Sequence, residues 1–160
     1  MTYSISGLSA ADFAPLFALD DAELKARGAV RVTASASQGF PCRVSLEDAR
    51  EGEQLILLHH TSHDVATPYR SAYAIYVREG AEQAGPFIDT TPPVFSGRPL
   101  ALRGFGADGM LRDARLAQPD MADEAIRALF DDLCIDYIDI HNAAHGCFAA
   151  RAHRYEEQAT

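Results

Sequence analysis

The stretch YIDIHNAAHGCFAARAHR, residues 137–154, alternates apolar and polar side chains on both sides of the turn residues NAAHG. Side chains alternate between the two faces of a strand, so this pattern predicts a hairpin with two unlike faces. If residue 141 pairs with residue 147, the apolar face carries Ile138, Ile140, Phe148 and Ala150. The polar face then carries Tyr137, Asp139, His141, Cys147, Arg151 and His153. Sliding the pairing by two residues changes the partners but leaves each side chain on its face.

The rest of the chain contains more predicted strands than helices. Strands are indicated by alternation, or by apolar runs between turn residues, over residues 3–8, 29–35, 53–61, 71–79, 99–105 and 110–117. Most links between these segments are too short for a parallel crossover. The strand at 53–61 is apolar on both faces, which indicates a central position in a sheet.

Helices are predicted where capping patterns precede apolar positions. Asp20 and Glu23 form a capping-box pattern before a helix that Gly28 is placed to end. Asp120 is expected to cap a helix over residues 121–133, whose apolar stripe is Ala122, Ile126, Leu129, Phe130 and Leu133. We therefore predict an α+β fold, a mostly antiparallel sheet with two or three helices packed on one face.

Size and composition are typical of a globular protein. At 160 residues, 48% of them hydrophobic, the chain is expected to form a single domain over 1–155 with a disordered tail at 156–160. The formal net charge is −9 and Lys25 is the one lysine, so we expect no nucleic-acid partner and no attachment to a membrane surface. No apolar run reaches the roughly 20 residues of a membrane helix, and the first residues lack a secretory pattern. The expected location is the cytoplasm.

The polar face of the hairpin is a candidate catalytic site. Asp139, His141 and Cys147 have the composition of an activated thiol, in which a histidine lowers the thiol pKa and an acid orients the imidazole. The alternative is a solvent-facing or ligand-facing sheet surface, because wet faces collect polar residues by default. Both interpretations stay open at this point.

A histidine-rich segment follows the predicted central strand. HHTSHD, residues 59–64, contains His59, His60, His63 and Asp64. The first two point to opposite faces if the strand continues, and neither HExxH nor CxxC spacing is present. We predict no metal site and no cofactor, and we expect these histidines to be hydrogen-bonded or solvent-exposed.

Arginines are conspicuous in a chain so poor in lysine. Arginine is preferred where a planar, bidentate grip on a carboxylate or phosphate is needed. Most of them are expected to pair with surface acids, and one or two to line an anion-binding cleft. The predicted ligand-binding residues are Cys42, Arg43, Arg70, Arg103 and Asn142.

Several segments together resemble a bacterial family called domain of unknown function 1203 (DUF1203). They are GFPCRVSL (39–46), YR (69–70), IYVRE (75–79), LRGF (102–105) and IHNAAHGC (140–147). The resemblance runs from the first strand to about Arg154, and PCR (41–43) and HNAAHGC (141–147) are its most specific pieces. It implies a small bacterial protein built as one unit, and it brings no activity, cofactor or catalytic residue.

Each of those two pieces contains a cysteine, which suggests that they meet in the fold. Under this hypothesis Cys42 lies close to Cys147, and Arg43, His141 and Asn142 share a cleft. The cleft would bind a small polar or anionic metabolite, with His141 as acid or base if the protein is an enzyme. A binding or regulatory module without chemistry is the first alternative. An interaction domain that uses the proline-rich segment 84–99 is the second, and a homodimer remains open.

Overall fold

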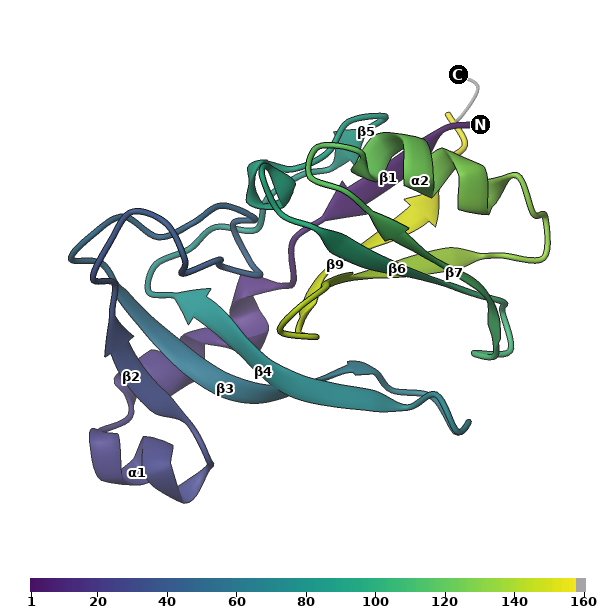
Figure 1. The fold of residues 1–160 in the computed structure, drawn as a ribbon. Coiled ribbons are helices and arrows are strands. Elements are labelled where there is room, and N and C mark those ends of the chain that lie inside the picture. Colours follow the sequence, from purple (N-terminus) through teal and green to yellow (C-terminus); the bar gives the residue numbers. More distant parts are fainter. Residues whose placement is uncertain (158–160) are drawn as a thin grey trace.

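The computed structural model describes residues 1–157 and forms mostly antiparallel sheets with few helices (Figure 1). A six-stranded sheet has the order β5-β1-β9-β8-β6-β7, and a three-stranded sheet has the order β2-β3-β4. The strands are β1 (Tyr3–Ser6), β2 (Val30–Thr33), β3 (Gln54–His63), β4 (Ser71–Arg78), β5 (Phe87–Ile88), β6 (Leu100–Phe105), β7 (Leu111–Ala117), β8 (Tyr137–Asn142) and β9 (Phe148–Arg154). The prediction of mostly antiparallel pairing is confirmed, whereas the strands form two sheets rather than one.

Two α-helices are present in the described residues, α1 (Asp21–Ala26) and α2 (Ala122–Phe130), together with 3-10 turns at Ala10–Asp12, Ala14–Ala18 and Pro93–Phe95. The capping box of α1 is confirmed: Asp20 accepts the Glu23 N–H, and the Glu23 side chain accepts the Asp20 N–H. Gly28 follows this helix with a φ of 71°, a conformation that glycine adopts without strain. Part of the predicted tail, residues 158–160, lies outside the described residues.

Helix α2 covers one face of the six-stranded sheet, against β6 and β7 (Figure 1). Ala122, Ile126, Leu129 and Phe130 are buried as the stripe predicts. The predicted bounds were wrong, because α2 ends at Phe130 and Leu133 is 84% exposed. The predicted cap was also wrong: Asp120 has a φ of 66° and accepts the Gly97 N–H instead of a helix N–H.

The hairpin β8–β9 lies at the centre of the six-stranded sheet, and its register is shifted from the predicted one. Tyr137 pairs with His153 and Asp139 with Arg151, a shift of two residues that leaves their faces unchanged. A register shift between Ile140 and His141 then pairs His141 with Phe148. A bulge of this kind reverses the facing of the residues beyond it.

The prediction that Phe148 lies on the apolar face was therefore wrong. Its side chain lies on the polar face. Its ring lies 5.9 Å from the His141 ring and 6.4 Å from the ring of His60 on β3. The apolar face keeps Ile138, Ile140, Ala150 and Ala152, all in the core beneath α2.

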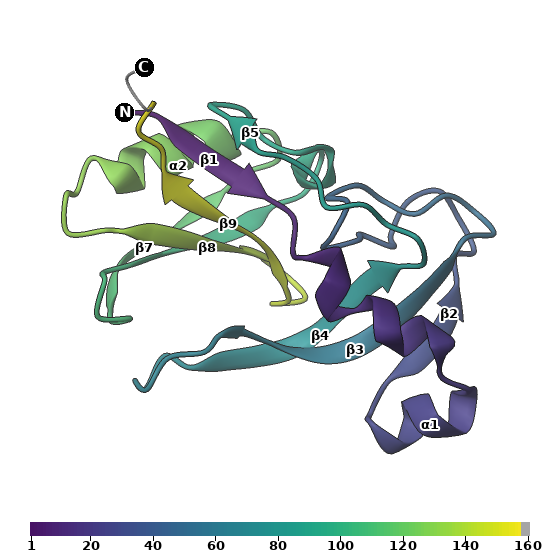
Figure 2. The ribbon, with the colours of Figure 1, turned by 180° about the vertical axis from the view of Figure 1, so that it is seen from behind.

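The three-stranded sheet lies opposite the polar face of the six-stranded sheet (Figure 2). β3 is central in it, as predicted, and its far end reaches the hairpin β8–β9. There Arg151 donates to the Ser62 carbonyl at 3.1 Å, and His63 Nε2 lies 2.7 Å from the Tyr137 hydroxyl. The polar face, for which the sequence left open a catalytic site or a solvent-facing or ligand-facing surface, is thus largely covered by protein. No helix among residues 1–157 is long and apolar enough to cross a membrane.

Candidate functional site

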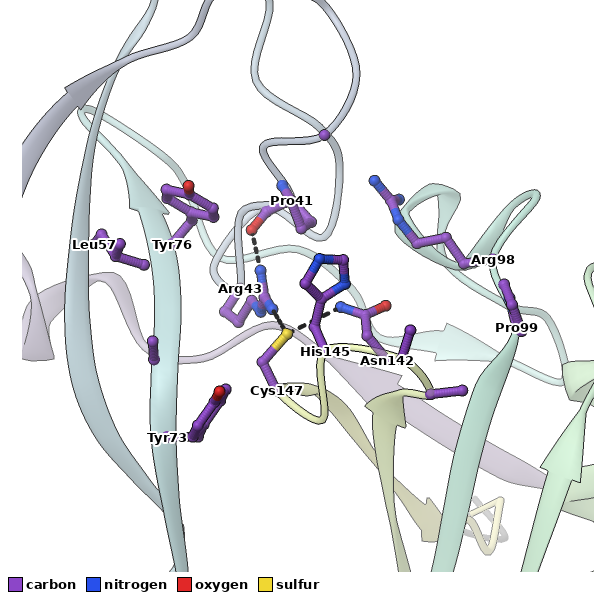
Figure 3. A pocket seen from close by; sticks show the side chains of 14 residues that line it. Pro41, Arg43, Leu57, Tyr73, Tyr76, Arg98, Pro99, Asn142, His145 and Cys147 are labelled. Atoms are coloured by element: carbon purple, nitrogen blue, oxygen red, sulfur yellow. Dashed lines mark hydrogen bonds between the residues drawn. The ribbon is translucent and has the colours of Figure 1, made fainter.

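A cavity of about 440 Å³ opens where the PCR segment, strand β4 and the turn between β8 and β9 meet (Figure 3). Its walls come from segments far apart in the sequence, and they combine aromatic and small apolar side chains with a few polar ones. The lining residues are Gly39, Pro41, Arg43, Leu57, Tyr73, Ala74, Tyr76, Arg98, Pro99, Asn142, Ala143, Ala144, His145 and Cys147.

Arg43 is the buried charge of this cavity, with an exposed fraction of 2%. A backbone bridge from Cys42 to Tyr76 ties the PCR segment to β4. From there the guanidinium donates from Nε to the Phe148 carbonyl at 2.7 Å, from Nη2 to the Cys147 sulfur at 3.1 Å, and from Nη1 to the Pro41 carbonyl.

No carboxylate lies within ion-pair distance of Arg43 among residues 1–157. Burial lowers the pKa of this guanidinium, and the adjacent Cys147 sulfur opposes that effect. A buried charge without a carboxylate partner is costly, so Arg43 depends on the carbonyl and sulfur acceptors around it.

Cys147 lies at the cavity wall with its sulfur between two N–H donors (Figure 3). The second donor is the Asn142 side-chain amide, with Nδ2 3.3 Å from the sulfur. The turn holds both residues in place: the Asn142 N–H donates to the Cys147 carbonyl, and the Gly146 N–H donates to the Asn142 carbonyl. Gly146 has a φ of 78°, which a side chain would disfavour.

The other two residues of the predicted triad have different partners. Asp139 is fully buried, and its carboxylate accepts from Arg151 Nε at 2.5 Å and Nη2 at 3.0 Å. His141 is 4% exposed, and its Nδ1 lies 2.9 Å from the Gly146 carbonyl. A carbonyl only accepts, so Nδ1 carries the proton in this contact. Neither residue lines the cavity.

The surroundings of His141 favour the neutral imidazole. Burial lowers its pKa, the Gly146 carbonyl acts in the opposite direction, and the charge of Arg103 lowers the pKa further. Arg103 Nη1 lies 3.4 Å from His141 Nε2. With one ring nitrogen donating to a carbonyl and the other facing a guanidinium, this ring serves the packing between the sheets.

Comparison with known proteins identifies the family. A family model described as a protein of unknown function, DUF1203, matches residues 39–154. The chain belongs to the DUF1203 family. No curated protein and no solved structure matches it. The stretch matched by the DUF1203 model contains every residue that lines the cavity.

The two pieces that carried the resemblance to DUF1203 do meet, through Arg43 rather than through a pair of thiols. Cys42 is fully buried, and its sulfur accepts the backbone N–H groups of Ser45 and Arg78. The Cys147 sulfur faces the cavity instead, and all three cysteines are free thiols.

The remaining predicted ligand-binding residues divide between the cavity and other places in this DUF1203 protein. Arg43 and Asn142 line the cavity. Arg103 contacts His141 between the sheets, and Arg70 pairs with Asp64 at 3.1 Å on the surface, where both side chains are exposed.

Sequence reasoning did not assign several lining residues of the DUF1203 cavity to a site. His145 belongs to the quoted turn, and Arg98 is among the conspicuous arginines; in the fold it pairs with Asp48 at 2.8 Å. Tyr73 lies within the strand predicted over residues 71–79, and its side chain is 57% exposed. Such an exposed aromatic ring beside a cavity is a signal that only the fold makes visible.

Proposed function

We propose that this DUF1203 protein binds a small anionic molecule in the cavity between the PCR segment and the β8–β9 turn. The observation that carries the proposal is Arg43, a buried guanidinium without a carboxylate partner among the described residues. A guanidinium has five N–H donors, and the contacts described above use three of them. Its other donors suit the two oxygens of a carboxylate or phosphate.

The size and walls of the cavity support a ligand of metabolite size. Small-molecule sites span roughly 300–1,000 Å³, are mostly apolar, and carry a few polar groups that orient the ligand. Here Tyr73, Tyr76 and Leu57 supply apolar wall, while Asn142 and His145 supply polar groups near Arg43.

A binding role is favoured over acid–base catalysis for this site. His141, the residue predicted to act as acid or base, does not line the cavity and has its ring nitrogens engaged with Gly146 and Arg103. Three free thiols fit a reducing compartment, so we also propose a cytoplasmic location.

The proline-rich segment 84–99 exposes one large apolar side chain, Ile88 at 42%, and buries those around Pro92, so it is less suited to docking a protein partner. An interaction surface there requires exposed apolar side chains. Pro92 is buried, and Val94 and Phe95 are 3% and 2% exposed within the core beneath α2. We therefore favour the ligand-binding proposal.

Thermal unfolding with added phosphate or succinate, at an ionic strength matched with chloride, tests the proposal. A ligand at about ten times its Kd should raise the midpoint by about 3–6 °C for a protein of this size. Ala74→Phe, which fills the cavity without changing a charge, should abolish the shift. Arg43→Lys, which keeps the charge but loses the planar fork, should reduce it.

Arg70→Gln is the matched control, since it removes an arginine that lies outside the cavity. Its midpoint should rise as much as that of the unsubstituted chain. Two results contradict the proposal: neither anion raises the midpoint beyond chloride, or the rise persists unchanged in Ala74→Phe.

A further inference from the structure

The three thiols of this chain lie in three different electrostatic surroundings. Cys147 is partly exposed at the cavity, Cys134 is exposed, and Cys42 is fully buried. Exposure by itself therefore predicts that Cys134 reacts first with any reagent in solution. The contacts of each sulfur lead to a different order.

The Cys147 sulfur has the surroundings of a nucleophile. The Arg43 guanidinium donates to it from 3.1 Å and the Asn142 amide from 3.3 Å, and the cavity gives small molecules access. A guanidinium without a carboxylate partner stabilises the negative sulfur that attacks an electrophile. N–H donors on the thiolate favour the charged form further.

Each of the other two sulfurs lacks either the side-chain N–H donors or the access from solvent that Cys147 has. Cys134 follows Asp131 and Asp132 in the sequence and precedes Asp136, and none of the N–H donors that contact a sulfur in residues 1–157 reaches it. Cys42 accepts two backbone N–H groups, yet it packs within an apolar cluster with Phe13, Val44 and Ile75 and has no exposed surface.

We propose that Cys147 is a nucleophilic thiol that small hydroperoxides oxidise to a sulfenic acid. The Cys147 thiolate attacks one oxygen of hydrogen peroxide, so that an S–O bond forms and the O–O bond breaks. The leaving hydroxide departs with the bonding electron pair and takes a proton from solvent to become water. The sulfur loses two electrons and the peroxide gains them, and the second N–H donors of Arg43 and Asn142 stabilise the charge on the departing oxygen.

This inference goes beyond the proposed function, because the oxidation needs no anion in the cavity. The two claims can fail separately: anion binding is measured by the thermal shift, and oxidation by labelling of Cys147. An anion held by Arg43 would compete with the thiolate for the same guanidinium, so phosphate or succinate that binds should also slow the labelling.

The test treats the full chain at neutral pH with hydrogen peroxide and dimedone, which traps sulfenic acids, and maps the labelled peptides by mass spectrometry. We expect Cys147 to be labelled about tenfold faster than Cys134, and Cys42 to stay unlabelled while the protein is folded. Labelling of Cys134 at the same rate as Cys147, or faster, overturns the proposal.

Asn142→Asp tests the cause, since it replaces an N–H donor beside the sulfur by a carboxylate of the same shape. Labelling of Cys147 should slow about tenfold while labelling of Cys134 is unchanged, and an unlabelled Cys42 reports that the variant is folded. Gln118→Glu is the matched control, because it adds the same charge outside the cavity. Equal Cys147 rates in Asn142→Asp and the unsubstituted chain overturn the proposal.

Discussion

The two faces of strand β8 are equally buried and chemically opposite. Ile138 and Ile140 pack into the core beneath α2 with no exposed surface. The alternating residues Asp139 and His141 are 0% and 4% exposed, yet their side chains contact Arg151 and Arg103. One strand thus separates an apolar layer from a polar one, and burial does not distinguish them.

The difference between the layers lies in what each side chain requires. An apolar side chain tolerates any close-packed neighbour, whereas a buried polar group needs a specific partner in a specific geometry. The polar layer supplies such partners: His63 bonds to Tyr137 and to the Tyr69 carbonyl, and its ring stacks 4.0 Å from that of Phe105. The polar layer therefore specifies how the two sheets fit, while the apolar layer supplies most of the hydrophobic stabilisation.

Substituting neighbouring residues on the two faces of β8 tests whether the polar and the apolar layer contribute to stability in these different ways. Asp139→Ala should lower the free energy of unfolding by about 3–5 kcal/mol, because it leaves the Arg151 charge between the sheets without its partner. Ile140→Ala should lower it by about 2–5 kcal/mol through a cavity in the core. Urea unfolding measures both.

A second substitution separates the two causes. Adding Arg151→Leu to Asp139→Ala removes the unpaired charge and should recover most of the loss, whereas adding it to Ile140→Ala should recover none. Additive costs in both backgrounds would show that the polar layer is not held by this ion pair.

Acidification should weaken the polar layer selectively. Burial lowers the pKa of His141 and His60 below the value of 6.5 that an unfolded chain shows. The unfolded state then binds protons first, so stability is complete above about pH 6.5 and is lost as the pH falls below it. We expect a loss of about 1 kcal/mol between pH 7 and pH 5.5 from His141, measured by urea unfolding at each pH. His141→Gln should flatten the profile, and an unchanged profile would contradict this account.

The smallest effect is expected on the outer surface. Arg70→Gln removes an exposed ion pair with Asp64 and should change the free energy of unfolding by less than about 0.5 kcal/mol. A larger loss by urea unfolding would mean that Arg70 has a structural contact beyond this pair. Arg70→Gln and Asp139→Ala together compare how much an exposed and a buried ion pair of the same chain contribute to the free energy of unfolding.

Sequence patterns predicted most of the local elements and, Phe148 apart, the faces of the central hairpin. The capping box at Asp20 and the stripe of α2 depend on neighbours within a few residues, so the sequence contains all the information they need. The failures were also local in origin: a bulge beside His141 and a positive φ at Asp120 depend on backbone details that alternation and capping patterns do not record.

The candidate site was predicted only in part. Arg43, Asn142 and Cys147 were identified as residues of interest, and the meeting of their two segments was a hypothesis that the contacts agree with. The roles of Asp139 and His141 depended on what lies opposite the polar face. No pattern in the hairpin could indicate that the end of β3 covers that face, because the covering segment lies far away in the sequence.

The sequence by itself determined which residues are apolar or polar, how they alternate, and where α1 starts, since these follow from backbone geometry and nearest neighbours. Only the tertiary structure decided which polar groups became a cavity and which became an interface. Arg43 reaches its partners Phe148 and Cys147 across 105 and 104 residues of chain. Contacts of such separation arise from the packing of one sheet on the other, and no local preference encodes them.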